Sequence, residues 1–190
     1  MINTSFTETL ETLELFKRGF DFLGFPTSLI QPSSATPFPL LVADVRSDFD
    51  GPGILLNMAF TGDILNVTHP GLAMIPALAN ELKFTLHTSY AVPAERQADL
   101  CQFLMVLNPL LPVGAYRMDA EGELSLNYGL QSEKRKIAPM VVVRVARLLG
   151  FFYEINQPYL TQLVLGESDY NETVARFEQE FGKVAPPRGV

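Results

Sequence analysis

Residues 114–128, GAYRMDAEGELSLNY, contain the clearest structural signal in the chain. Two alternating segments flank a turn that ends in Gly122. A three-residue loop with glycine in the left-handed conformation closes such segments into a β-hairpin. That register pairs Met118 with Leu124 and Tyr116 with Leu126, which places the large apolar side chains on one face. The turn chemistry and the period-two pattern agree, and together they predict an antiparallel hairpin.

Three segments before the hairpin also have the composition of strands: 38–45, 53–60 and 82–90. In the last of them, apolar and polar residues alternate, which is typical of a half-buried strand in an antiparallel sheet. His87 falls on its polar face. Segment 38–45 is apolar on both faces, so we expect both to be covered. Residues 30–39 are predicted to form a Pro/Ser loop. Residues 61–80 could hold a short strand at 64–68 and a helical turn at 72–78.

Apolar residues at helical spacing predict helices around these strands. The first helix ends before Gly24 and Pro26, and a second extends from Pro93 to Asn108. A third, long helix extends from Pro139 towards Leu165 and ends at Gly166. Residues 140–152 of this helix are apolar nearly all round, which favours burial against a sheet, a partner subunit, or both. The core stripe of the second helix is expected to consist of Leu100, Phe103, Leu104 and Leu107.

The element order is therefore α-β-β-β-α-β-β-α plus one further helix, which predicts an α+β fold with an antiparallel sheet packed with helices. We assign residues 1–167 to an α+β domain, 168–182 to an appended amphipathic helix and 183–190 to a tail.

Composition narrows the function classes. The 190-residue chain has a net charge of −7 and a pI near 4.8, which argues against nucleic-acid binding. Its longest basic run, 134–136, is predicted to be a solvated linker. Cys101 is the single cysteine, so an intrachain disulfide is excluded. No secretory signal and no apolar run long enough to span a bilayer is found, which predicts a cytoplasmic protein.

Several local motifs resemble a known family. The sequence VPAER at 92–96 opens a helix, and Leu107-Asn108 precedes LPVGAY at 111–116. The turn at 119–122 follows, and residues 159–167 close the long helix. Together these features resemble the YbjN-like branch of the type III secretion chaperone-like superfamily. The match is best over 81–167 and weaker over 6–60, whereas segment 61–80 and the helix after Gly166 depart from it.

The resemblance implies helices packed on a twisted antiparallel sheet, often in a homodimer. Secretion chaperones bind extended segments of client proteins, and the YbjN-like branch is linked to regulation. The family supplies no catalytic residues, so none are assigned here.

The residues themselves show no catalytic or metal-binding pattern. A nucleophilic or metal site gathers several titratable side chains. His87 and His69 are far apart in the sequence, and His69 falls in a predicted loop. Cys101 lies beside the apolar stripe of its helix, and we expect it to be buried and inert. We therefore predict a non-enzymatic protein that needs no cofactor or metal.

The most informative feature for function is that the chain has more apolar strand and helix surface than a small monomer needs to bury. The candidate protein-interaction residues are Tyr170, Val174, Phe177 and Phe181 of the last helix, which could dock on its own sheet, swap onto a partner, or mask a groove. The first hypothesis is a chaperone-like or adaptor module that binds a protein client, acting as a homodimer. The alternative is a small-ligand-binding regulator with an apolar pocket between sheet and helices. An enzyme is the third and weakest reading.

Overall fold

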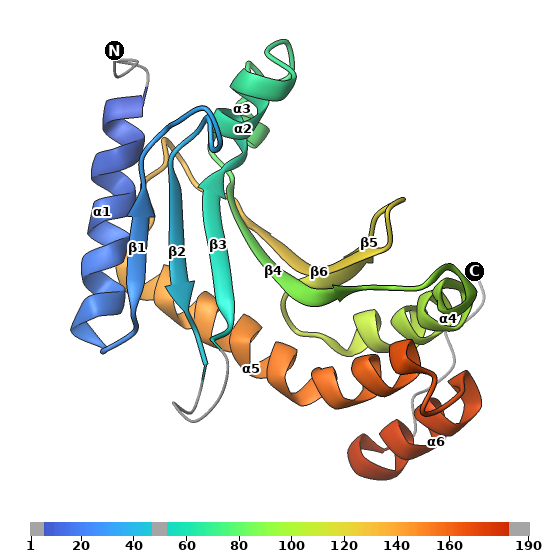
Figure 1. The fold of residues 1–190 in the computed structure, drawn as a ribbon. Helices are drawn as coiled ribbons and strands as arrows, with labels where there is room; N and C mark the ends of the chain where they lie inside the picture. Colours follow the sequence, from blue (N-terminus) through green and yellow to red (C-terminus); the bar gives the residue numbers. More distant parts are fainter. Residues whose placement is uncertain (1–5, 47–52, 183–190) are drawn as a thin grey trace.

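The computed structural model describes residues 6–46 and 53–182. The predicted tail, 183–190, lies outside these residues. Figure 1 shows the element order. The helices and strands are α1 (Thr7–Phe22), β1 (Thr27–Ile30), β2 (Leu40–Asp44), β3 (Leu55–Phe60), α2 (Thr61–Thr68), α3 (Pro76–Ala79), β4 (Leu82–Ala91), α4 (Gln97–Leu107), β5 (Ala115–Met118), β6 (Glu123–Leu130), α5 (Pro139–Leu165) and α6 (Tyr170–Phe181).

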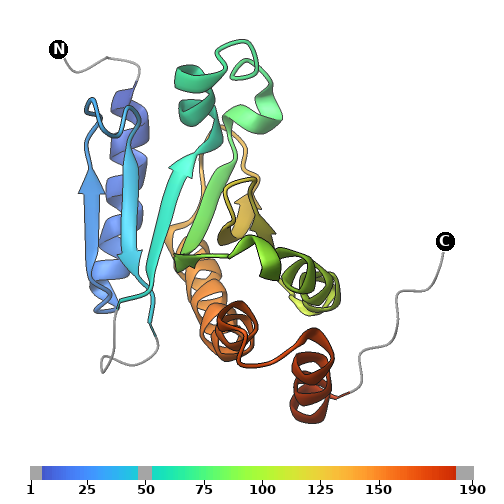
Figure 2. The same cartoon turned by 45° about the vertical axis from the view of Figure 1, so that its right-hand side comes forward.

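The strands form one antiparallel sheet in the order β1-β2-β3-β4-β6-β5, so the predicted α+β class is confirmed. Helices α1 and α5 lie on the same side of this twisted sheet (Figures 1 and 2). Their inward side chains meet a continuous row of apolar residues that crosses the strands, including Leu41, Met58 and Phe84. The hydrophobic core therefore lies between this face and the helices, and we call the opposite face of the sheet the open face.

The predicted hairpin is confirmed in register and in turn. Met118 pairs with Leu124, and Tyr116 with Leu126. Gly122 has φ +83°, a conformation that side chains disfavour. The carboxylate of Asp119 accepts hydrogen bonds from the backbone N–H groups of Glu121 and Glu123, at 3.1 and 2.8 Å. The local sequence therefore supplies the conformation of this turn, and the N–H of Val92 adds a hydrogen bond to the carbonyl of Gly122 at 2.8 Å.

Strand β4 bends where its pairing with β6 becomes irregular, between His87 and Ala91. Such irregularities leave backbone groups without ladder partners. The Thr88 hydroxyl lies 2.9 Å from the carbonyl of Tyr90 and 3.1 Å from that of Leu124, and the Tyr153 hydroxyl donates to the carbonyl of His87 at 3.2 Å. Side chains thus replace the missing ladder bonds.

The structure corrects several expectations. Residues 27–30 form the edge strand β1, part of which was assigned to a loop; the strand is short and flanked by Pro26 and Pro32, so its pattern is weak. Residues 61–68 form helix α2 instead of a turn and a strand. In β2, Leu41 and Ala43 are buried, whereas the residues on the open face are only partly buried, so the expectation of two covered faces is wrong.

The prediction that the basic run at 134–136 is a solvated linker is wrong for Arg135, which is largely buried. Its guanidinium lies 2.9 Å from the carboxylate of Asp63, which is 2% exposed. Thr9 of α1 donates to the same carboxylate at 2.9 Å, and Arg135 Nε donates to the carbonyl of Ala79 at 3.2 Å. Arg135 also stacks over the Phe60 ring, 4.7 Å from its centroid. One side chain thus connects α1, α2 and α3.

Burial raises the pKa of Asp63, although Arg135 and Thr9 oppose the shift. We expect Arg135→Ala to destabilise the fold by about 3 kcal/mol, because it leaves a buried carboxylate without its counter-ion. Without Arg135, the Asp63 pKa rises further above its ordinary value of 3.8. Folded Asp63 then binds a proton at pH values where the unfolded chain does not, so the penalty shrinks as pH falls towards that value.

Urea denaturation at several pH values measures this effect. Lys136→Ala is the matched control, since Lys136 is exposed in the same segment and should change stability by less than about 0.5 kcal/mol. Equal effects of the two substitutions, or a pH-independent penalty for Arg135→Ala, would contradict the ion-pair interpretation.

Helix α5 lies unusually close to the end of β2. A methyl group placed on Gly150 would lie 2.7 Å from the backbone carbonyl oxygen of Val45. Helix α5 also contacts α1, where a methyl group on Gly19 would lie 3.2 Å from Cβ of Pro139. The missing side chain at Gly150 therefore sets how closely α5 can approach the sheet.

Gly150→Ala should destabilise the protein by about 1–3 kcal/mol, because a backbone carbonyl cannot yield to the new methyl group. In an ordinary helix interior, replacing glycine with alanine has the opposite effect and increases stability by up to about 1 kcal/mol. Gly19→Ala, also inside a helix but facing a side-chain atom, should have the smaller effect. Thermal and urea unfolding measure both, and stabilisation by Gly150→Ala would refute the close-approach argument.

Candidate protein-interaction surface

Helix α5 has a buried side and an outward side of different character. The buried side includes Val142, Val143, Ala146 and Leu149. The outward side is also apolar, and its residues Leu148 and Phe151 are 44% and 51% exposed. We call the outward set the α5 surface, which consists of Met140, Val141, Arg144, Arg147, Leu148 and Phe151.

The spacing of the α5 surface explains its continuity. Val141, Arg144, Leu148 and Phe151 are separated by three, four and three residues, so they follow one line along the helix. The same spacing forms the seam of paired helices in coiled coils. From Val141 to Phe151, this line is about 15 Å long at 1.5 Å per residue.

The α5 surface contains a shallow hollow. It is lined by Arg144, Arg147, Leu148 and Phe151, with a volume of about 490 Å³. Arginine is enriched in protein interfaces because its stem packs on apolar groups while the guanidinium binds acceptors. The hollow therefore offers a partner an apolar contact bordered by two positive charges.

The sequence-predicted interaction residues lie elsewhere, on α6. Asp169 caps this helix: its carboxylate accepts from the N–H of Glu172 at 2.9 Å, and the Glu172 side chain accepts from the N–H of Asp169 at 3.2 Å. Helix α6 contacts α4 and α5 (Figure 2). Tyr170 and Val174 are partly buried against the core.

Phe177 is the anchor of α6. It is 4% exposed, with its ring centroid 5.8 Å from Phe103 of α4 and 5.3 Å from Tyr159 of α5. Phe181 follows 4.9 Å from Phe177 and remains 51% exposed. Of the three arrangements left open by the sequence, the helix adopts docking within its own chain, on helices and not on the sheet. Phe181 is the one predicted residue that keeps a largely exposed ring.

The structure does not gather the histidines and the cysteine into one site. His87 lies exposed on the polar face of β4, as predicted, and His69 lies exposed between α2 and α3. Cys101 is exposed, so the expectation of a buried thiol is wrong: its helix turns it away from the stripe at Leu100 and Phe103. Among residues 6–46 and 53–182, no group of three or more His, Cys, Asp or Glu could hold a metal ion.

Sequence reasoning did not identify a cluster of tyrosines beneath the bend in β4. Burial raises the pKa of Tyr116 and of Tyr90, and it raises the pKa of Tyr153 to about 12. The Tyr90 hydroxyl donates to Gln157 of α5 at 3.3 Å. In the other direction, the Tyr153 hydroxyl of α5 donates to the carbonyl of His87 in β4 at 3.2 Å. The cluster therefore holds α5 against β4.

No protein-family model matches the chain, and neither does any curated protein or any solved structure. The resemblance to the YbjN-like family therefore remains a prediction. Within the part of the chain that the structure describes, no helix has both the length and the apolar character that crossing a bilayer requires.

Phe177→Ala should release α6 from α4 and α5 and destabilise this contact by about 3 kcal/mol, because a large buried ring is lost. Hydrogen exchange of the α6 amides should then accelerate, while the sheet amides remain protected. Phe181→Ala is the matched control on the same helix face, and it should have less than half the effect. If both substitutions accelerate exchange equally, Phe177 is not the anchor.

Proposed function

We propose that this chain is a non-enzymatic protein-binding module, and that the α5 surface is its main contact site. One observation carries the proposal: Val141, Leu148 and Phe151 stay exposed on the outer side of α5, in line with Arg144, although the opposite side of the same helix is buried. Exposed apolar patches of this kind occur at protein–protein contacts. The flanking arginines also favour a protein partner, because charged residues border the apolar centre of most interfaces.

A second copy of the chain is the simplest partner, and it agrees with the homodimer that the family resemblance implies. Two α5 helices packed antiparallel about a two-fold axis would place Leu148 of one copy against Phe151 of the other. A two-fold interface requires such self-complementarity. A client segment would then add to an exposed sheet edge, β1 or β5, since each pairs with only one strand.

The double substitution Leu148→Asp with Phe151→Asp should weaken association at least hundredfold. Each buried apolar anchor in an interface contributes about 2 kcal/mol or more, and about 1.4 kcal/mol corresponds to a factor of ten. Sedimentation or light scattering over a concentration series measures the monomer–dimer equilibrium. Both residues are exposed in the monomer, so the variant should fold normally by circular dichroism.

Met105→Asp is the control, because Met105 is an exposed apolar residue on α4, outside the α5 surface. It should leave association unchanged. A wild-type protein that stays monomeric at about 100 μM, far above a micromolar dissociation constant, would exclude the homodimer. A dimer that survives the double substitution would exclude the α5 surface as its interface.

A further inference from the structure

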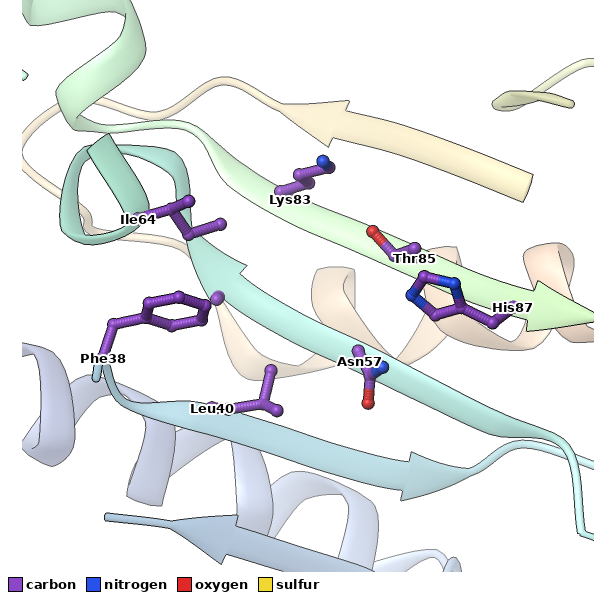
Figure 3. A pocket seen from close by; sticks show the side chains of 8 residues that line it. Phe38, Leu40, Asn57, Ile64, Lys83, Thr85 and His87 are labelled. Carbon is purple, nitrogen blue, oxygen red and sulfur yellow. The ribbon is translucent and has the colours of Figure 1, made fainter. Parts of the chain in front are cut away.

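The open face of the sheet carries a groove on the side of the molecule away from the α5 surface. Figure 3 shows its side chains, which come from β2, β3, β4, helix α2 and the loop before β2. Its volume is about 170 Å³. Pockets that bury drug-sized ligands measure roughly 300–1,000 Å³, so this groove suits a smaller molecule.

The groove is apolar at one end. Phe38 and Ile64 lie close to one another there, near Leu40 (Figure 3), and Ala59 completes the apolar lining. Ile64 reaches this position because residues 61–68 fold as helix α2 directly after β3. The resulting recess fits one small aliphatic or aromatic group.

The other end, at Asn57, Thr85 and His87, is polar, and the positively charged Lys83 lies between the two ends, where it pairs with Ala59. Asn57 pairs across the strands with Thr85, which lies between Lys83 and His87 on β4 (Figure 3). Two residues of strand span about 7 Å, so the Lys83 and His87 side chains can both reach a group bound above Thr85. Among the described residues, the side chains of Asn57, Lys83 and His87 have no hydrogen-bond or ion-pair partner.

The positive charge of the groove is unusual for the chain. The protein has 21 acidic and 14 basic residues, yet no acidic residue lines the groove. The nearby Glu81 is engaged by Thr61 at 2.7 Å and by Gln131 at 2.7 Å. The Thr85 hydroxyl donates to Asn127 at 3.1 Å, so the hydrogen-bond donors left for a ligand are on Asn57, Lys83 and His87. These three donors select an acceptor-rich, negatively charged group.

We propose that this groove binds a small carboxylate with an apolar substituent. The carboxylate lies above Thr85 and accepts hydrogen bonds from Asn57 and Lys83, with His87 on its other side. The apolar substituent enters the recess between Phe38 and Ile64. The sequence left a small-ligand function open but placed its pocket between sheet and helices, whereas this groove lies on the opposite face.

The probe for this site is 3-phenylpropionate, in which two methylene groups separate the ring from the carboxylate. Two-dimensional ¹H–¹⁵N NMR of the full chain should show saturable shifts at the amides of Asn57, Thr85 and His87. The neutral analogue 3-phenylpropanamide tests the charge, and propionate tests the apolar group. Each should bind at least tenfold more weakly than the probe.

Lys83→Met should also reduce the affinity for the probe at least tenfold. Lys136→Met changes the net charge equally but lies outside the groove, so it should leave the affinity unchanged. Lys83 is exposed, so its replacement should leave the fold intact. Equal binding of the acid and its amide, or shifts that map away from β3 and β4, would overturn the proposal. The Leu148→Asp, Phe151→Asp variant should bind the probe as the wild type does, which separates this site from the α5 surface.

Discussion

The packing of α5 against the sheet is the contact on which the rest of the structure depends. Its buried side contacts β4 and belongs to the same apolar core as the inner faces of β2 and β3, and Gly150 allows the helix backbone to approach the carbonyl of Val45. Helix α1 packs beside it, and α6 docks on its C-terminal half. Because a helix 27 residues long crosses the whole sheet, its position determines which side chains of the other elements can be buried.

Polar contacts complete what apolar packing begins. Arg135 joins α1, α2 and α3 through one buried carboxylate, and Tyr153 and Thr88 satisfy the carbonyls that the bend in β4 exposes. Each of these contacts links residues that are close in space, and several link residues far apart in the sequence. They matter because an unpaired buried polar group costs more than its hydrogen bond contributes when formed. The hydrogen bonds therefore fix how these helices and strands are placed relative to one another, which apolar packing specifies less closely.

The sheet gives the molecule two sides of different character. On one side the helices fill the core and leave the outer side of α5 as an apolar surface bordered by arginines. On the other side the open face stays partly exposed, and α2 overhangs it at one end. The two sites differ in size, since the hollow on α5 measures about 490 Å³ and the groove about 170 Å³.

Elements with strong local signals could be predicted from the order of residues alone. The turn chemistry at Asp119 and Gly122 specifies the hairpin, strict alternation specifies β4, and apolar spacing specifies the core stripe of α4, all as found. The antiparallel α+β class followed from these elements. The predictions were wrong for segments with weak local signals. Strand β1 has only four residues, and α2 is stabilised by an ion pair with a residue 72 positions away.

Which apolar surfaces stay exposed depends on how the elements pack together in the folded chain. Sequence reasoning chose the α6 stripe as the interaction site, because its apolar spacing is clear, but spacing cannot show that Phe177 is already buried against Phe103 and Tyr159. Similarly, residues 140–152 are apolar on all sides, and the sequence gives no sign of which side faces the sheet. The groove requires Phe38, Asn57, Ile64 and Lys83 to converge from separate elements. Local propensity acts over a few residues, whereas burial depends on contacts between residues distant along the chain, so the fold alone assigns each apolar side chain to core or surface.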